Sequence, residues 1–267
     1  MTRGAATLAV LVLGAAQAAI WQGSSGGFAV RWTERDLTAA RAAGGAPVLS
    51  LRTVENEAWA EMSSDSVQPA LHYAAEYRVL SLVGRVLSVS SRHDCNCGGA
   101  HPISWSGFHA YDLARGTREK PHPIEITELF PAADVRAALV VDPVVRRMLA
   151  ASGAGTPRTL EHLVTTLQES TVEVAGCTYT AGPDFLASFA LHHLEGGRAA
   201  VRFSLPYRHE VCRGRMIQLG VLIPVPPRLR AELEAAGARR AGFLMQDAQR
   251  ISGGRATTLE YGPPALR

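Results

Sequence analysis

Residues 77–91, YRVLSLVGRVLSVSS, decide the fold, because this stretch has the strongest apolar pattern in the chain. Apolar side chains alternate along it and occupy most positions of both faces. Such a pattern is typical of a β-strand that is buried on both sides. We expect one long strand here, with Gly84 forming a bulge.

A glycine-rich corner follows, DCNCGGAHP at residues 94–102. Beyond it, residues 103–111 alternate again, which predicts a second strand joined to the first across the corner. The aromatic residues of this second strand, Trp105, Phe108 and Tyr111, are mostly core candidates. Of the three, we expect Trp105 to reach the surface.

Helices are predicted in the middle of the chain. Asp142-Pro143 has the pattern of an N-cap followed by proline in the first helical turn, so residues 135–141 and 143–151 should form two short helices. A third, amphipathic helix is predicted where apolar residues recur at helical spacing: Leu160, Leu163, Val164 and Leu167. Its apolar stripe should lie on the sheet.

The last third of the chain is mostly strand. Residues 189–194 and 199–205 alternate on either side of Glu195-Gly196-Gly197, which predicts a hairpin. Residues 217–223 form another alternating strand, which ends at prolines. A short helix is expected at residues 228–236, and the C-terminal segment 237–267 is polar enough to be a partly ordered tail.

The N-terminal part combines a predicted export signal with a weakly patterned segment. Arg3 precedes an apolar run, and Ala16-Gln17-Ala18 matches a cleavage site, so residues 1–18 are predicted to be a signal peptide. The run is shorter than the ~20 residues that span a bilayer, so no membrane-spanning segment is expected after cleavage. Within residues 19–76, a short helix is expected at residues 33–43. The protein should be exported, to the periplasm or the medium.

The charge distribution disfavours nucleic acid as a partner. The formal net charge is +3, Lys120 is the only lysine, and the arginines are scattered along the sequence. A nucleic-acid-binding surface usually shows a basic stripe or patch. We expect no nucleic-acid partner and no cofactor, and the sequence predicts no oligomeric state.

The corner could be a metal site, a thiol catalyst or a stapled turn. The candidate metal ligands are His93, Cys95, Cys97, His101 and His109. Zinc-binding cysteines are usually two to four residues apart, whereas these two cysteines have one residue between them. The spacing therefore disfavours zinc, and we predict no metal ligand.

A catalytic thiol would pair Cys95 or Cys97 with His93 or His101, because a nearby base or cation lowers the pKa of a thiol. In an exported protein, however, an exposed low-pKa thiol beside a second cysteine would oxidise. An envelope thiol or zinc enzyme that uses Cys95, Cys97 and His101 is the alternative function.

A stapled turn is the interpretation that we favour. Gly98 and Gly99 allow backbone dihedrals that other residues resist, and Pro102 pushes His101 into an extended conformation. Four cysteines in an exported chain allow three disulfide connectivities. The expected pairs are Cys95–Cys97 and Cys177–Cys212. The second pair would close a long loop and stabilise the fold by roughly 4 kcal/mol in the chain-entropy model.

Two further polar groups have simple interpretations. His192 and His193 are neighbours in a predicted strand, so their side chains should point to opposite faces and cannot bind one ion together. A basic loop before the last strand could meet an anion, although a solvated turn is the simpler interpretation. That loop contains Arg208, His209, Arg213 and Arg215, with Glu210 among them.

The order of these motifs resembles the RsiV-like domain of unknown function. The resemblance rests on the long strand, GGAHP at 98–102, YDL at 111–113, ITELF at 126–130 and the closing strands. This family includes the extracellular lysozyme-binding domain of a sigma-V anti-sigma factor and a domain found in some peptidoglycan deacetylases. The resemblance extends over about residues 77–229, and we place the domain at residues 77–236.

The resemblance implies an α+β fold in which helices pack on one face of an antiparallel sheet. It also implies a binding domain rather than an enzyme, so no catalytic residue is predicted. We expect an exported, non-enzymatic domain that binds a cell-envelope ligand, either peptidoglycan or a wall-active protein such as lysozyme. The candidate binding residues lie in the corner and in the loop before the last strand: Gly98, Gly99, His101, Trp105, Tyr207, Arg208 and His209.

Overall fold

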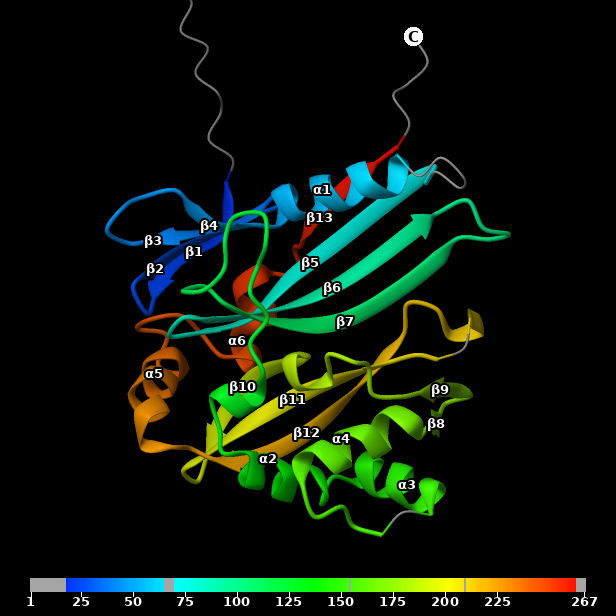
Figure 1. Cartoon of the computed structure of the whole chain (residues 1–267). Helices are drawn as coiled ribbons and strands as arrows, with labels where there is room; N and C mark the ends of the chain where they lie inside the picture. The colour runs from blue at the N-terminus through cyan, green and yellow to red at the C-terminus, as the bar shows by residue number, and fades with distance from the viewer. Residues whose placement is uncertain (1–17, 65–69, 154, 209, 263–267) are drawn as a thin grey trace, which may run out of the picture.

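The computed structural model describes residues 18–64, 70–153, 155–208 and 210–262. All of the predicted signal peptide except Ala18 lies outside these ranges. The α+β class is confirmed, with antiparallel pairing throughout, and the strands are divided among four sheets rather than one. Figure 1 shows two main layers of sheet, with helices on their outer sides.

The upper layer in Figure 1 is a four-stranded antiparallel sheet. Its strand order is β13 (Thr257–Tyr261), β5 (His72–Val83), β6 (Val86–Asn96) and β7 (Ile103–Asp112). The predicted pairing of strands across the corner is therefore present, because β6 enters the corner and β7 leaves it.

The stretch at residues 77–91 forms a hairpin, so the expectation of one strand bulged at Gly84 is wrong. The last residue of β5 pairs with the first residue of β6 across the two-residue turn Gly84-Arg85. Gly84 has a φ of 55°, and hairpin turns of this length require a positive φ that glycine adopts without steric cost. The apolar alternation continues on both sides of the turn, which made two strands look like one.

A four-stranded meander precedes this sheet and packs against it. Its strands are β1 (Ala19–Ser25), β2 (Phe28–Thr33), β3 (Leu37–Arg41) and β4 (Pro47–Ser50), paired in chain order. The short helix expected at residues 33–43 is therefore wrong. Leu37 and Ala39 alternate with more exposed neighbours and are buried, which suits a strand.

Helix α1 (Leu51–Ser63) begins directly after β4. The Ser50 hydroxyl accepts a hydrogen bond from the backbone N–H of Thr53 at 3.2 Å and so caps the first turn. In Figure 1, α1 lies on the outer side of the upper sheet, alongside β13 and β5. Its buried residues are Leu51 and, unusually for a helix this polar, Glu55.

The lower layer is a three-stranded antiparallel sheet in the order β10 (Phe189–Glu195), β11 (Arg198–Pro206) and β12 (Met216–Pro224). The predicted hairpin is confirmed, with Glu195 opposite Arg198. Four alternating side chains of β11 share one face and are all buried: Ala199, Val201, Phe203 and Leu205.

Short helices cover the lower sheet on its outer face (Figure 1). They are the 3₁₀ helices η1 (Ile126–Glu128) and η2 (Phe185–Ala187) and the α-helices α2 (Ala132–Leu139), α3 (Pro143–Ser152) and α4 (Leu160–Glu169). The predicted cap is confirmed, since the Asp142 carboxylate accepts from the N–H groups of Val144 and Val145 at 2.8 and 3.2 Å. A small hairpin, β8 (Val172–Val174) and β9 (Cys177–Tyr179), follows α4.

The C-terminal segment is part of the fold, which corrects the expectation of a partly ordered tail for residues 237–262. After α5 (Pro227–Gly237), the chain forms α6 (Met245–Ser252) and then β13, which pairs with β5. Leu259 is buried at the centre of this pairing. Polar composition alone did not reveal the strand, because its partner lies almost two hundred residues away.

Two buried apolar clusters stabilise the layers. The lower core lies between the lower sheet and the helices that cover it. It consists of side chains on the helix-covered face of the sheet and the facing side chains of α2, α3 and α4, including Phe189 and Phe203. The upper core lies between the meander and the upper sheet and includes Trp32 and Leu82. Within the described residues, no helix is long and apolar enough to cross a membrane.

Candidate functional site

The two loops that were predicted as binding surfaces lie against each other. The loop before β12, residues 207–214, packs along the outer edge of β7, next to the corner. The backbone N–H of Gly214 donates to the Ser104 carbonyl at 3.2 Å, and the Tyr207 hydroxyl donates to the same oxygen. Arg213 donates to the Pro102 carbonyl at 2.7 Å. The structure therefore makes one continuous surface from residues that are a hundred positions apart.

Each loop is fixed by a disulfide, and both predicted pairs are present. Cys95–Cys97 joins the end of β6 to the first residue after the strand, and Cys177–Cys212 ties the loop 207–214 to β9. The loop is also held by the N–H of Arg208, which donates to the Thr178 carbonyl at 2.8 Å. The short 3₁₀ helix η3 (Glu210–Cys212) lies within it.

Exposed apolar side chains occur on the strands and loops that form this junction. Ile103 and Trp105, which share one face of β7, are 40% and 36% exposed, and Val211 on the neighbouring loop is 85% exposed. Leu71, whose N–H donates to the Asn96 carbonyl at 2.8 Å, is also exposed. We call Leu71, Ile103, Trp105 and Val211 the corner patch. Among the described residues, the other exposed large apolar side chain is Val141, on the far layer.

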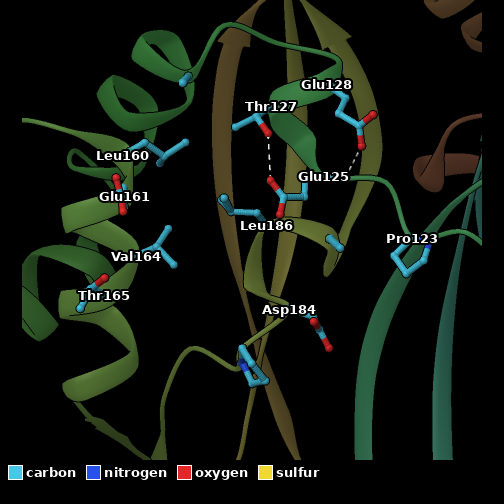
Figure 2. Close-up of a pocket in the computed structure, with 13 residues that line it drawn as sticks. Pro123, Glu125, Thr127, Glu128, Leu160, Glu161, Val164, Thr165, Asp184 and Leu186 are labelled. Atoms are coloured by element: carbon cyan, nitrogen blue, oxygen red, sulfur yellow. Dashed lines mark hydrogen bonds between the residues drawn. The ribbon is translucent and has the colours of Figure 1, made fainter.

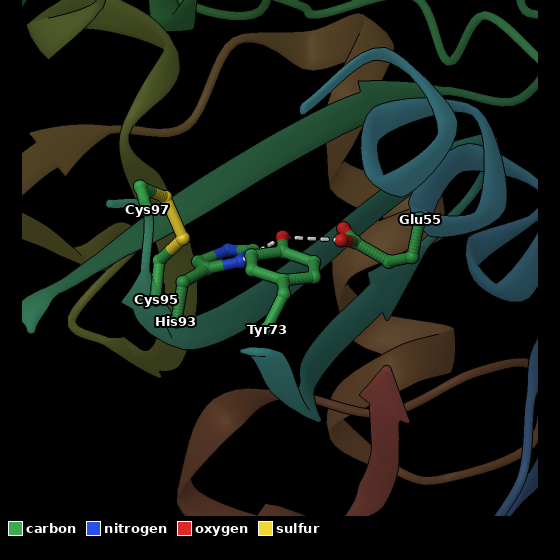
Figure 3. Close-up of a disulfide and its surroundings, with 5 residues drawn as sticks. All are labelled: Glu55, Tyr73, His93, Cys95 and Cys97. Carbon is green, nitrogen blue, oxygen red and sulfur yellow. Dashed lines mark hydrogen bonds between the residues drawn. A yellow bond between two sulfur atoms is a disulfide. The ribbon is translucent and has the colours of Figure 1, made fainter. Parts of the chain in front are cut away.

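A buried polar cluster lies on the Trp105 face of the upper sheet, and Figure 3 shows three of its members, Glu55, Tyr73 and His93. Glu55 of α1 is only 3% exposed and accepts hydrogen bonds from the hydroxyls of Tyr73 and Tyr77. The Tyr73 hydroxyl also lies 2.7 Å from Nδ1 of His93. Because that hydroxyl gives its single proton to Glu55, Nδ1 of His93 must be the donor in the second bond. We call Glu55, Tyr73, Tyr77 and His93 the polar cluster.

The polar cluster contacts the corner patch through the His93 imidazole, which packs on Trp105. The His93 ring stacks under the Trp105 indole, with ring centroids 4.9 Å apart and planes 8° from parallel. The Tyr73 ring lies beside both, with its centroid 5.9 Å from that of His93 and 6.3 Å from that of Trp105. The exposed tryptophan is thus positioned by a chain of contacts that runs back to α1.

Comparisons with family models, curated proteins and solved structures found no match. The surface just described is therefore interpreted from its own chemistry.

Burial sets the protonation of the polar cluster. It raises the pKa of both Tyr73 and Tyr77 well above the usual range, and the adjacent Glu55 carboxylate adds to each shift. Burial lowers the pKa of His93 to about 4; His109 lowers it further, and Asp94 opposes the shift. At neutral pH the imidazole under Trp105 is therefore uncharged.

Most of the residues predicted for binding line the junction. Gly98 has a φ of 78°, which the corner requires, and Gly99, His101, Trp105 and Arg208 are exposed. Tyr207 is partly buried and serves to hold the loop. His209 lies outside the described residues. The sequence-predicted surface is thus assembled, although Tyr207 contributes to its architecture rather than its exposed face.

The metal and thiol interpretations gain no support from the geometry. All four cysteines are paired, and Nδ1 of the exposed His101 lies 3.4 Å from the Pro102 carbonyl. Within the described ranges, no three side chains of His, Cys, Asp or Glu converge as metal ligands would. A thiol enzyme at Cys95 or Cys97 would require the Cys95–Cys97 disulfide to be reduced.

The adjacent histidines of β10 differ from the prediction. His192 and His193 do not point to opposite faces, because a bulge between Leu191 and His193 interrupts the alternation. Their Nδ1 atoms lie 2.7 Å apart. Burial lowers the pKa of His192, and Arg202 and His193 lower it further. This geometry supports a hydrogen bond between the two imidazoles.

A separate cavity of about 720 Å³ lies between α4, η1 and η2 (Figure 2). Its apolar side chains include Leu160, Val164 and Leu186, and its rim carries four carboxylates: Glu125, Glu128, Glu161 and Asp184. Glu128 is neutralised by Arg115 at 2.5 Å, and Glu125 helps to cap η1. None of the sequence-predicted binding residues lines this cavity.

The sequence did not reveal the polar cluster. Glu55 lies in the helix LRTVENEAWAEMS, where it looks like one of several solvated charges. Tyr73 and Tyr77 precede or begin the strand pattern, and His93 drew attention only as a possible metal ligand or partner of a thiol. The available signal was the spacing of Tyr73 and Tyr77, which share one face of a strand.

Proposed function

We propose that this chain is an exported, non-enzymatic binding domain of the RsiV-like family, which uses the corner patch and the adjoining arginines to hold peptidoglycan. The observation that carries the proposal is that Trp105 and Ile103 are exposed beside two loops that are each crosslinked by a disulfide. Exposed apolar side chains that cluster on a rigid support are typical of binding surfaces.

The junction is rigid before any ligand arrives, which favours binding. Both loops are crosslinked, and their backbone groups are bonded to β7 or β9. The indole is already stacked on His93. A surface that is ordered in advance loses less conformational entropy when it binds.

The charges beside the patch favour an anionic, sugar-bearing ligand. Arg208, Arg213 and Arg215 are all exposed on the loop 207–214 or directly after it. Arginine binds carboxylates with paired hydrogen bonds, and peptidoglycan peptides carry carboxylates next to sugar rings that can pack on an indole. A cationic protein such as lysozyme suits this loop less well.

The test is cosedimentation of the purified protein with insoluble peptidoglycan. We expect saturable binding that weakens at least tenfold in Trp105→Ala and in Ile103→Ser, and less strongly in Arg208→Ala. Val141→Ser is the matched control, because Val141 is an exposed apolar residue away from the corner patch. Circular dichroism checks that each variant is folded.

Immobilised lysozyme provides a second arm of the experiment. Binding to lysozyme without binding to peptidoglycan would replace the proposed ligand by an envelope protein. Absence of binding to both, or equal binding by Trp105→Ala and Val141→Ser, would contradict the proposal.

A further inference from the structure

A smaller cavity lies on the opposite face of the upper sheet from Trp105. It has a volume of about 300 Å³ and opens where this face, the start of β12 and the helix α6 meet. Its floor includes Leu80 and Phe108, which form with Ala190 a small cluster that is separate from the upper and lower cores. Because Trp105 and Phe108 are three residues apart on β7, they point to opposite faces. The cavity is therefore independent of the corner patch.

The floor and walls of the cavity are apolar and adaptable. Leu80 and Phe108 are 8% and 1% exposed. Met216 from β12 and Met245 from α6 pack against this floor and are only partly buried. Methionine side chains are flexible and polarizable, so opposed methionines can adjust to the shape of an inserted group. The cavity volume lies at the lower end of the roughly 300–1,000 Å³ found for ligand pockets.

The polar groups of the cavity are confined to a few residues and include one charge. Among the described residues, Arg78 is the only ionisable one that lines it, and its neighbour across the strands is Ser90. Gln218 and Gln249 add amide groups that are exposed to solvent. An apolar floor with one guanidinium at its mouth complements a molecule that has an apolar body and one anionic group.

The guanidinium can exchange its present partner for a ligand. Arg78 is paired with Glu76 at 3.0 Å, and the two side chains are 46% and 40% exposed. Exposed ion pairs of this kind contribute little to stability, so opening this one costs little. Arginine binds a carboxylate more strongly when the pair is partly shielded from water, as it would be at the rim of this cavity.

We propose that the cavity between β5, β12 and α6 binds a single-chain amphipathic anion, with an alkyl group on Leu80 and Phe108 between Met216 and Met245 and a carboxylate on Arg78. This function is additional to wall binding, and either one can fail without the other.

The chain contains its own probes for this proposal. Its methionines are Met1, Met62, Met148, Met216 and Met245, and two of these line the cavity. We would label the methionine methyl groups with ¹³C and titrate the protein with sodium decanoate while recording NMR spectra. The expected result is saturable shifts at Met216 and Met245, with Met62 and Met148 unchanged because they lie in other parts of the fold.

The role of the charge is tested with a matched pair of variants. Arg78→Gln should weaken decanoate binding at least tenfold, whereas Arg147→Gln, on the exposed face of α3, should leave it unchanged. Decanol, which has the same chain without the charge, should bind the wild type at least tenfold more weakly than decanoate. Decanol should bind Arg78→Gln and the wild type equally.

Three outcomes would overturn the proposal. They are no shift at Met216 and Met245, equal shifts at all the methionines, and equal decanoate affinity in Arg78→Gln and Arg147→Gln. Cosedimentation with phosphatidylglycerol vesicles distinguishes a free amphiphile from a membrane surface. The protein should stay in the supernatant, and sedimentation that depends on Arg78 without decanoate binding would assign the cavity to a lipid bilayer.

Discussion

The upper and lower cores of this protein are of similar architecture but different chemistry. The lower core is filled by apolar side chains, with Phe203 between Phe185 and Phe189 at ring distances of 5.1 and 6.2 Å. Beside the upper core lies the polar cluster, in which Glu55 is held by two phenols. Each core also contains one disulfide, a long-range one below and a local one above.

This difference shows that the buried hydrogen bonds lie beneath an exposed side chain, Trp105, whose orientation they help to fix. An apolar core gains stability from burial and does not depend on pH. A buried polar network fixes directions through hydrogen bonds, but unpaired members are costly. The polar cluster lies directly under Trp105, where fixed directions matter.

The largest expected difference between the cores concerns their disulfides. Replacing Cys177 and Cys212, which are 35 positions apart, by alanine should lower the free energy of unfolding by about 4 kcal/mol in the chain-entropy model. The same change at Cys95 and Cys97, two positions apart, should cost only about 1.5 kcal/mol. Urea unfolding of both double variants measures the two losses. An equal loss would mean that local geometry, rather than loop length, sets the contribution of each crosslink.

The pH dependence of stability should distinguish the cores next. The pKa of His93 is about 4 in the folded state and near 6.5 when unfolded, so the unfolded chain binds the extra proton first as the pH falls. The free energy of unfolding is therefore unaffected by this group above about pH 6.5. It declines by about 3 kcal/mol as the pH falls to about 4.

His93→Gln isolates this effect, because glutamine does not titrate. Urea unfolding at pH 7 and pH 4.5 should show a smaller loss of stability on acidification in His93→Gln than in the wild type. The pKa values of His192 and His109 are also lowered by burial, so these two residues reduce stability on acidification in both proteins alike. Parallel pH profiles of the two proteins would contradict the burial of a neutral imidazole at His93.

The smallest effect is expected at Glu55. Glu55→Gln keeps the size of the side chain but turns one of its two acceptor oxygens into a donor, so one phenol loses its partner. The expected loss in the free energy of unfolding is about 1–2 kcal/mol. Glu57→Gln, an exposed change in the same helix, should stay within about 0.5 kcal/mol of the wild type. Equal effects at the two positions would show that Glu55 makes no net contribution.

The parts of the fold that sequence could predict are those with local signals. Alternation identified β7, β11 and β12, and Asp142-Pro143 marked the start of α3. The disulfide pairing was predicted from an expected oxidising environment and from which cysteines are close in sequence. Each of these depends on residues within a few positions or on one chemical rule.

The parts that sequence could not predict depend on distant partners. β13 is a strand because β5 offers it an edge, and Glu55 is buried because Tyr73 and Tyr77 lie opposite α1. The bulge that brings His192 and His193 together has no local signature. For the candidate site, sequence located both loops, but only the folded chain shows that they meet at Ser104.

The meeting at Ser104 also has a consequence for solubility. β7 is the edge of the upper sheet, and exposed edges recruit strands from other molecules. Here the Ser104 carbonyl is occupied by Gly214 and Tyr207, and the loop that supplies them is tied down by Cys177–Cys212. The same crosslink that shapes the proposed binding surface therefore protects the sheet from intermolecular pairing, so a chain in which Cys177 and Cys212 stay reduced should aggregate more readily.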